Sequence, residues 1–411
     1  MSKKELSIGQ SIAWNSLGNI TYLGCSWLIT ILVVLLGADY SASGQLAVAM
    51  SVGNVFATIV LFRVRPVQVS GSYSQFDSSV FVGARWVTSI AAVIICCIYG
   101  FLTVSKSNYE IVALYCLFKF VESYIDVLHG IDQINNRLDY AAVSQILRGV
   151  LLVAGFIAGL QLFNSLPAAI LLMSLSSLLV LVLYDNNRAK QFSSVTPSFA
   201  LGPIASLLRI CAPGFLASFC CTAVVSIVRQ RYGLIYGDQL LGVYAAVAAP
   251  TVIVQALISY LYAPLLGPLA SRWNKKDYAG VIHSIKRVAL VGVAATLLLT
   301  IASLLFGEPV LRLLLGNGAA NCSYYLPAML FSTLAVGLNL FAIDLSIAFG
   351  RSAIATAASL VSFVMATVFS SCLYQATSFV DANSISLIVL FAQLIGFVII
   401  IGYLFHIARN S

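Results

Sequence analysis

Charged residues are scarce in this chain. Only 9% of its 411 residues are Asp, Glu, Lys or Arg, and 60% are hydrophobic. Soluble domains carry about 25% charged and about half apolar residues, so this composition excludes a soluble globular protein. A membrane-spanning helix uses about 20 residues, and a dozen of them would use roughly 240. The short connections that remain leave no room for a separate soluble catalytic domain.

The sequence motifs of common enzyme classes are also missing. The chain has no G-x-x-x-x-G-K-[ST] nucleotide loop, no G-x-S-x-G nucleophile turn and no H-E-x-x-H metal site. Its nine cysteines are an odd number, and most lie in apolar runs, where cysteine packs as a small hydrophobic residue. We therefore expect no enzyme activity, no disulfide framework, no metal site and no cofactor.

Long apolar runs make up most of the sequence. Runs bounded by charges, Gly, Pro or Asn predict about twelve transmembrane helices in an all-α, polytopic membrane protein. We expect these helices near residues 8–36, 43–62, 80–103, 111–130, 141–161, 168–184, 203–229, 240–266, 285–306, 323–348, 352–376 and 386–406. The first run lacks an A-x-A cleavage site, so it is expected to be a retained span rather than a signal peptide.

Basic residues between the runs predict the orientation in the membrane. Fourteen lie in segments on one side: Lys3, Lys4, Arg63, Arg65, Arg137, Arg188, Lys190, Arg272, Lys275, Lys276, Lys286, Arg287, Arg351 and Arg409. Four lie on the other side: Lys106, Arg229, Arg231 and Arg312. Cytoplasmic segments carry the excess of Lys and Arg, so both termini should be cytoplasmic. The net charge of +8 thus reflects topology, and we expect no nucleic-acid partner.

The chain also divides near its middle. Residues 185–199, DNNRAKQFSSVTPSF, are polar and Ser-rich, as a cytoplasmic linker would be. Gly44 and Pro66 have the same spacing of 22 residues as Gly242 and Pro264. The pattern predicts two related six-helix bundles, 1–184 and 200–411, around a central cavity with the substrate site between them. Chance similarity of apolar segments is the alternative.

The most informative polar pattern belongs to the span expected at 111–130. Six polar residues recur every three or four positions along it and just beyond: Tyr115, Lys119, Glu122, Asp126, His129 and Gln133. This spacing places them on one face of a helix. A charge near the bilayer centre costs about 2.5 to 3.5 kcal/mol, so that face must line a cavity or polar seam. We interpret Lys119 as substrate-binding and Glu122 and Asp126 as ion-coupling; a salt-bridge ladder serving assembly is the alternative.

Other spans carry isolated charges. Arg148 and Arg209 lie about seven residues inside their spans, roughly 10 Å deep at 1.5 Å per residue, and are candidates for substrate binding. Snorkelling to the membrane surface is their alternative, and for Arg85, closer to the end of its span, it is the expected role. Asp344 is a candidate ion-coupling acid or else an interfacial partner of Arg351.

Uncharged polar residues form two further stripes at helical spacing. One consists of Asn15, Asn19, Tyr22 and Ser26, and the other of Thr251, Gln255, Ser259 and Tyr262. Asn15, Asn19 and Gln255 are candidate hydrogen-bonding partners of a sugar, although such residues also join helices within a membrane. Pro213 and Pro250 lie within spans, where a missing N–H and a ring clash predict kinks.

Several of these features also occur in one transporter family. They are Asn15 and Asn19 in the first span, Leu36-Gly37 and Ala47 to Ala49 after it, and Arg63 with Arg65 after the second. A further segment, GIDQINNRLDYAAVSQILRGV, contains Arg148. These features resemble bacterial O-antigen and polysaccharide flippases of the Wzx type. The second half echoes that family only at Gly242, Pro264 and the basic residues Arg272, Lys275 and Lys276.

The resemblance implies a fold and a function. Wzx-type flippases belong to the multidrug/oligosaccharidyl-lipid/polysaccharide (MATE-like) exporter superfamily. They move an undecaprenyl-pyrophosphate-linked oligosaccharide from the cytoplasmic to the periplasmic leaflet, coupled to a proton or sodium ion. This implies the bacterial cell inner membrane, contact with membrane lipid, a role in lipopolysaccharide or other polysaccharide biosynthesis, and a polysaccharide polymerase as a candidate partner. Lys119, Arg148 and Arg209 suit a pyrophosphate. The alternatives are a drug/cation antiporter of the same superfamily, with an acidic and apolar cavity, and a non-transport membrane component of glycan assembly.

The charge count generates a prediction about topology. Cysteine labelling from each side of the membrane, or reporter fusions, should place residues 185–199 in the cytoplasm and residues 307–322 outside it, because basic segments stay on the cytoplasmic side. The reverse labelling pattern would contradict the orientation.

Overall fold

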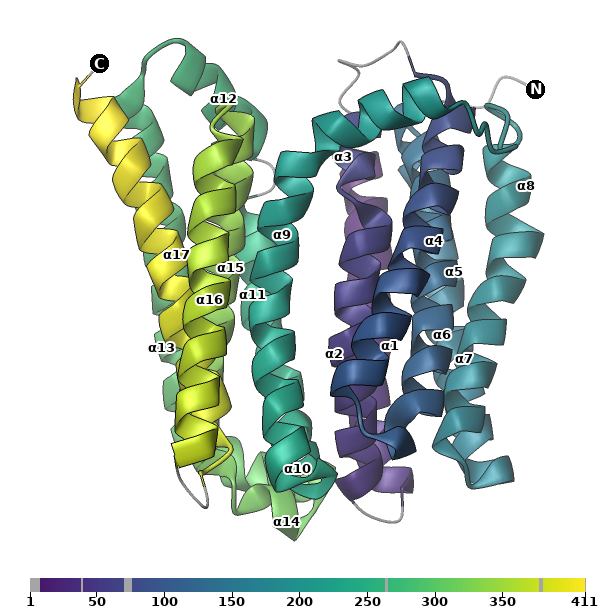
Figure 1. Cartoon of the computed structure of the whole chain (residues 1–411), viewed down its shortest axis with the longest axis vertical. Coiled ribbons are helices and arrows are strands. Elements are labelled where there is room, and N and C mark those ends of the chain that lie inside the picture. The colour runs from purple at the N-terminus through teal and green to yellow at the C-terminus, as the bar shows by residue number, and fades with distance from the viewer. Residues whose placement is uncertain (1–7, 38–39, 70–75, 263–264, 377–379, 411) are drawn as a thin grey trace. The chain divides into compact units, whose positions relative to one another are not determined.

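All regular elements that the computed structural model describes are helices (Figure 1). It describes residues 8–37, 40–69, 76–262, 265–376 and 380–410. Among them, the expected spans correspond to α1 (Ile8–Leu36), α2 (Tyr40–Leu61), α4 (Ser78–Thr103), α5 (Tyr109–Ile134), α6 (Leu138–Phe163), α7 (Leu166–Val180), α9 (Leu201–Tyr236), α10 with α11 (Asp238–Ala248 and Val252–Tyr262), α13 (Tyr278–Leu315), α15 (Leu326–Ala348), α16 (Ser352–Ala376) and α17 (Asn383–Asn410). The all-α prediction is confirmed.

Short elements connect the long helices. They are α3 (Val64–Val69), the 3₁₀ turn η1 (Lys106–Asn108), the π-helical turn η2 (Leu181–Asp185), α8 (Asn186–Ala189), the 3₁₀ turn η3 (Ala249–Thr251), α12 (Leu266–Asn274), α14 (Asn317–Ala320) and the 3₁₀ turn η5 (Ser323–Tyr325). Two of them, α3 and η2, carry residues of the candidate site described below.

Eleven helices in the described part of the chain are long and apolar enough to cross a membrane. The twelfth expected span, α5, is long enough at 26 residues but carries more charge. Its charged residues are Glu110, Lys119, Glu122, Asp126 and Asp132. Because charges cannot face lipid at low cost, α5 needs protein around it.

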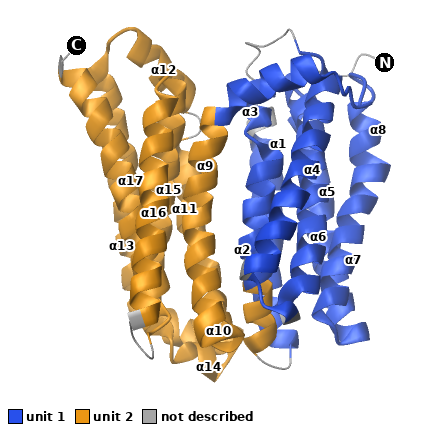
Figure 2. Ribbon diagram, viewed as in Figure 1, with its two compact units in different colours: residues 1–38, 48–212 blue, residues 39–47, 213–411 orange. Residues whose placement is uncertain are grey.

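The chain forms two compact units, drawn in blue and orange in Figure 2. Unit 1 comprises residues 1–38 and 48–212, and unit 2 comprises residues 39–47 and 213–411. The division therefore falls inside α9, at Pro213, beyond the linker expected at 185–199. Those linker residues belong to unit 1: Ala189 and Val195 are buried in its core, and the Ser198 N–H donates to the Ser79 carbonyl of α4 at 2.9 Å.

In unit 1, α5 lies among the other helices. It packs against α3, α4, α6, α7 and α8, and much of its length is buried. Val121, Ile125 and Leu128 of α5 form an apolar core with side chains of α3, α4 and α9. At its other end, Gly53 of α2 lets the Tyr115 ring approach so closely that a Cβ there would lie 2.3 Å from it. The polar face of α5 is thus enclosed by protein, as its charges require.

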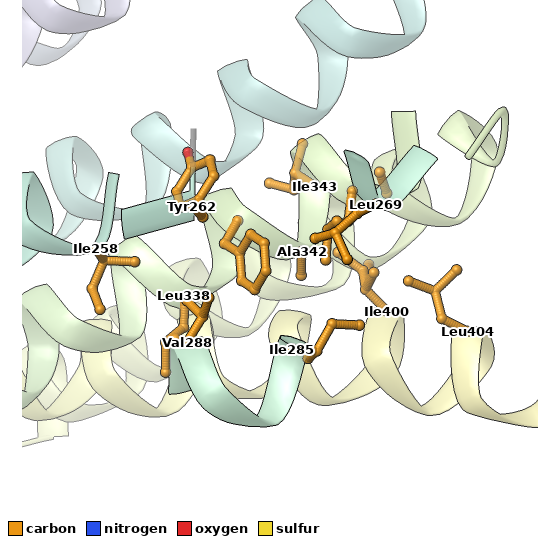
Figure 3. Close-up of a cluster of buried hydrophobic side chains, with 14 of the residues drawn as sticks. Ile258, Tyr262, Leu269, Ile285, Val288, Leu338, Ala342, Ile343, Ile400 and Leu404 are labelled. Atoms are coloured by element: carbon orange, nitrogen blue, oxygen red, sulfur yellow. The ribbon is translucent and has the colours of Figure 1, made fainter. Parts of the chain in front are cut away.

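Unit 2 has its own apolar core, drawn in Figure 3. Side chains of α11, α12, α13, α15 and α17 meet there, among them Ile258, Leu269, Val288 and Ile400. The Tyr262 ring stacks on Phe341 with 4.9 Å between ring centroids. This packing holds the end of α11 against α15.

Three of the expected spans differ most from the structure. The span expected at 240–266 is interrupted at Pro250 by η3, as the missing proline N–H predicts. Helix α13 has 38 residues and extends beyond 285–306 at both ends, so much of the loop expected at 307–322 is helical. Helix α9 continues past 229, which places Arg231 inside it, where the guanidinium donates to the Thr367 carbonyl at 2.7 Å.

The glycines of the predicted repeat are in close contact within unit 2. A Cβ on Gly242 would lie 2.0 Å from the Tyr40 carbonyl oxygen, and one on Gly44 would lie 1.8 Å from the Asp238 carbonyl oxygen. The Ser43 hydroxyl also donates to the Gly242 carbonyl at 3.2 Å. Small residues of this kind let two helix backbones approach each other in a membrane.

This contact predicts that Gly242→Val lowers stability, because the new side chain would push the start of α2 away from α10. Overpacking of this kind costs about 1 to 3 kcal/mol or more. The measurement is the thermal unfolding temperature of the purified protein in detergent. Gly402→Val is the matched control in unit 2, since a Cβ at Gly402 meets nothing within 4 Å. Equal unfolding temperatures for the two variants would contradict the prediction.

Candidate functional site

Six charged side chains of unit 1 form two ion-paired groups, centred on Glu122 and Asp126 one turn apart on α5 and here together named the cationic cluster. They are Arg65 from α3, Arg85 from α4, Lys119, Glu122 and Asp126 from α5, and Arg148 from α6. Four cations and two carboxylates leave a net charge of 4 − 2 = +2.

Asp126 joins two arginines. Its Oδ1 atom lies 2.9 Å from Arg65 Nη1, and its Oδ2 atom lies 3.1 Å from Arg85 Nη2. Arg85 also donates from Nη1 to the Val60 carbonyl at 2.6 Å, and its side chain is fully buried. The expectation that Arg85 snorkels to the membrane surface is therefore wrong. A buried guanidinium is stable here because a carboxylate and a carbonyl accept hydrogen bonds from it.

A sharp backbone turn brings Arg65 to this site. Phe62 and Arg63 adopt left-handed conformations, with φ of 44° and 55°, between α2 and α3. After this turn, Arg65 Nη2 donates to Gln133 Oε1 at 3.1 Å, and Gln68 donates to the Val127 carbonyl at 3.2 Å. Two consecutive non-glycine residues at positive φ are uncommon and costly, and such conformations are concentrated at functional sites.

Glu122 joins the other two cations. Its Oε2 atom lies 2.7 Å from Lys119 Nζ, one helical turn away, and its Oε1 atom lies 3.4 Å from Arg148 Nη2. The Lys119 ammonium lies 5.2 Å from the Phe118 ring centroid, and the Arg148 guanidinium lies 4.4 Å from that of Tyr22 on α1. Aromatic faces of this kind stabilise cations away from water.

The four cations differ in exposure. The side chains of Arg65 and Lys119 are 27% and 19% exposed, whereas Arg85 and Arg148 are 0% and 7% exposed. In addition, the buried Nε atoms of Arg85 and Arg148 have no hydrogen-bond partner among the described residues. An excess of positive charge with little water around it binds anions through strong charge-assisted hydrogen bonds.

Further along α5, a histidine belongs to a separate contact. His129 Nε2 lies 3.1 Å from Asp185 Oδ1, and the Ser144 hydroxyl of α6 donates to Asp185 Oδ2 at 3.0 Å. Asp185 is the last residue of the π-helical turn η2. On α1, the Asn19 side-chain oxygen accepts a hydrogen bond from Gln145 Nε2 of α6 at 3.0 Å.

The other predicted site residues lie outside the cluster. Asn15 is half-buried on α1, and Arg209 is exposed on the part of α9 that belongs to unit 1. Gln255 and Asp344 belong to unit 2. Asp344 accepts a hydrogen bond from the Tyr262 hydroxyl at 3.0 Å.

The sequence analysis thus identified Lys119, Glu122, Asp126 and Arg148 as candidate site residues. It did not identify Arg65, Arg85 and Asp185. One signal was present for Arg85. It lies seven residues after the start of α4, and Asp126 lies eight residues before the end of α5, so the two side chains share a depth in neighbouring antiparallel helices. The sequence places Arg65 and Asp185 in polar connections between the spans, where no local pattern marks either as part of a buried site.

No protein-family model and no curated protein matches the sequence of this chain. Solved structures do match its fold. The eukaryotic MATE transporter AtDTX14 has a TM-score of 0.69 at 12% identity, covering 97% of this chain and 96% of that chain. This chain has the MATE transporter fold.

Two further matches are a multidrug resistance MATE family transporter of the MOP superfamily in two conformations. The inward-facing structure has a TM-score of 0.65 at 11% identity and covers 100% of this chain and 97% of that chain. The outward-facing structure has a TM-score of 0.62 at 10% identity and covers 97% of this chain and 94% of that chain. With eleven apolar spans in its described part, the protein is a multi-pass membrane protein.

The buried pairing of Arg85 generates a stability prediction. Arg85→Met should lower stability by about 1 to 3 kcal/mol, because it removes a buried charge-assisted hydrogen bond while Asp126 keeps Arg65 as its partner. The readout is thermal unfolding in detergent together with the yield of monodisperse protein. Arg209→Met is the control, since it removes an exposed guanidinium from the same unit.

A double variant separates charge from packing. Arg85→Met with Asp126→Asn should be less stable than Arg85→Met alone, because it also removes the carboxylate that pairs with Arg65. If Arg85→Met is as stable as the control, the buried pair does not hold α4 and α5 together.

Proposed function

We propose that this protein is a flippase that moves an undecaprenyl-pyrophosphate-linked oligosaccharide from the cytoplasmic to the periplasmic leaflet. The observation that carries the proposal is the cationic cluster, in which four cations surround two carboxylates inside a membrane protein. An uncompensated positive charge in a membrane marks a substrate or ion pathway. A lipid pyrophosphate is a membrane-bound substrate with the charge to balance it.

The chemistry of the cluster suits this substrate. Arg65 and Lys119 keep partly exposed cationic groups, and a pyrophosphate oxygen is a strong acceptor for both. Arg148 lies behind them with an Nε atom that lacks a partner among the described residues. Amide groups that could contact a sugar lie on neighbouring helices, where Gln145 donates a hydrogen bond to Asn19. Asn15, Arg209 and Gln255 remain further candidates for substrate contact.

A drug/cation antiporter with the same fold is the second candidate. It needs a carboxylate that can bind a cationic drug. In the cluster, both carboxylates are already held by two cations each, Glu122 by Lys119 and Arg148 and Asp126 by Arg65 and Arg85. The charge balance therefore favours an anionic substrate. A non-transport role in glycan assembly is the third candidate.

Movement of the substrate would proceed by alternating access coupled to a proton or sodium ion. Structures with this fold exist in inward- and outward-facing conformations, which supports that part of the proposal. Glu122, Asp126 and Asp344 are the proposed ion-coupling acids.

The test is transport of a fluorescent undecaprenyl-pyrophosphate oligosaccharide across reconstituted vesicles. Lys119→Ala should slow flipping by at least about tenfold, because it removes a charge-assisted hydrogen bond worth about 1.5 to 3 kcal/mol. Lys106→Ala is the matched control, since it removes an exposed lysine of unit 1 outside the cluster. Lys119→Arg, which keeps the charge, should retain part of the activity.

The same vesicles distinguish the candidates. Unchanged flipping by Lys119→Ala would remove the central support for the proposal. Wild-type vesicles that move an organic cation but not the lipid would favour the antiporter, and vesicles that move neither would favour a non-transport role.

A further inference from the structure

One arginine of unit 2 lies inside a span. From the sequence, Arg229 counts among the basic residues between the spans. In the structure, α9 continues to Tyr236, so Arg229 lies seven residues before the end of the helix. At 1.5 Å per residue this is about 10 Å from that end. The proposed function does not use Arg229.

The guanidinium of Arg229 stays at this depth. It lies 5.8 Å from the ring centroid of Tyr244, which is six residues, or about 9 Å, from the start of the neighbouring helix α10. The Tyr244 ring is buried, and its hydroxyl shares a hydrogen bond of 2.8 Å with the Ser386 hydroxyl of α17. Arg229 is therefore directed at a buried ring inside unit 2, and snorkelling to the membrane surface does not describe it.

Arg229 has no ion pair among the described residues. From residue 213 onward the chain has five acids: Asp238, Asp277, Glu308, Asp344 and Asp381. Two of them pair with other arginines, and none of the five pairs with Arg229. The buried Nε atom of Arg229 also lacks a hydrogen-bond partner among the described residues. An aromatic face alone offsets little of the cost of a half-buried guanidinium, so positive charge remains uncompensated here.

The next arginine on the same helix shows the difference. Arg231 donates to the Thr367 carbonyl of α16 at 2.7 Å and to the Ser370 hydroxyl at 3.4 Å. Arg231 thus joins α9 to α16 and uses its donors within the fold. Arg229 keeps its donors for a group that the described fold does not supply.

We propose that Arg229 is a second binding residue for the anionic head group of the substrate, separate from the cationic cluster. This inference rests on the proposed function and adds a contact in unit 2 to it. A phosphate oxygen supplies the negative charge and the acceptors that Arg229 lacks. Arginine also presents two parallel N–H groups to such an oxyanion, which makes the contact strong even on one side chain.

The expected topology gives this contact a place in transport. Under the orientation predicted from the basic residues, the end of α9 at Tyr236 lies outside the membrane. Arg229 then belongs to the outward half of its span, whereas Arg65 follows the cytoplasmic end of α2. An anion that moves outward meets Arg229 after the cluster. Because Arg229 has no carboxylate to pair with, it attracts the anion while the cluster cations return to their own acids.

The first experiment measures flipping of the fluorescent lipid in phosphatidylcholine vesicles, which contain no anionic phospholipid. Arg229→Met should slow flipping by at least about tenfold, because a charge-assisted contact with the substrate is lost. Arg229→Lys keeps the charge and should retain part of the rate. Arg312→Met is the matched control, since Arg312 is an exposed arginine of the same unit that pairs with Glu308. It should flip the lipid like the wild type.

Two outcomes of this assay separate the inference from the proposed function. Wild-type flipping by Arg229→Met, with slow flipping by Lys119→Ala, would overturn the inference and leave the proposed function standing. Absence of flipping by the wild-type protein would overturn both.

Thermal unfolding in detergent tests whether Arg229 is merely structural. Arg229→Met should unfold at or above the wild-type temperature, because it removes a poorly hydrated charge and leaves no acid without a partner. Arg231→Met should unfold at a lower temperature, because it removes hydrogen bonds between α9 and α16. Equal destabilisation by the two substitutions would make Arg229 a structural residue and overturn the inference.

A further experiment uses the wild-type chain. The protein in detergent is treated with phenylglyoxal, which modifies guanidinium groups, and the modified arginines are located by peptide mass spectrometry. Inorganic pyrophosphate should slow modification of Arg229 but not of Arg312. The protection of Arg229 should persist in Lys119→Ala, because the two sites are separate. Loss of protection in that variant, equal modification of Arg229 with and without pyrophosphate, or no modification of Arg229 at all would each contradict the proposal.

Discussion

The bridge from Asp126 to Arg65 and Arg85 is the interaction on which unit 1 depends. A lone carboxylate inside a membrane is costly, and so is a lone guanidinium. Placing Asp126 between two arginines removes both costs and joins α3, α4 and α5. It also explains how α5, with five charged residues, can lie among helices that are nearly all apolar. Apolar side chains of α3, α4 and α5 pack beside the bridge and reduce its contact with water, which strengthens it.

The same pairing creates the excess charge of the site. Glu122 and Asp126 each pair with two cations, of which Lys119 lies on α5 itself and the other three on neighbouring segments, so neutralising two acids brings four basic groups together. Arg85 and Arg148 are buried and serve mainly the carboxylates, while Arg65 and Lys119 keep part of their surface exposed. Structure and candidate function therefore share residues: the inner cations fix the acids, and the outer cations are the ones that a ligand can reach.

Sequence predicted the helices well because length and apolar content are local properties. It also predicted the polar face of α5, since helical periodicity alone places Lys119, Glu122 and Asp126 together. It misplaced Arg85, because the choice between snorkelling and pairing depends on which helix lies beside it. It also missed Asp185, because nothing local marks the π-helical turn that aims this residue at His129. The packing of the helices decides which side chains from distant segments pair with each other. A single sequence does not show that packing.

Under the proposed function, Glu122 and Asp126 would also affect release of the substrate. A cluster of four cations without Glu122 and Asp126 would hold a pyrophosphate tightly, and a transporter that cannot release its substrate does not turn over. With Glu122 and Asp126 present, each cation that releases the ligand can pair again with a carboxylate that lies within 3.4 Å of it. The free energy of binding is then the difference between two sets of charge-assisted contacts, which is small compared with either set. Under the proposed function, Glu122 and Asp126 would thereby stabilise the fold when the site is empty and weaken the binding of the substrate enough for its release.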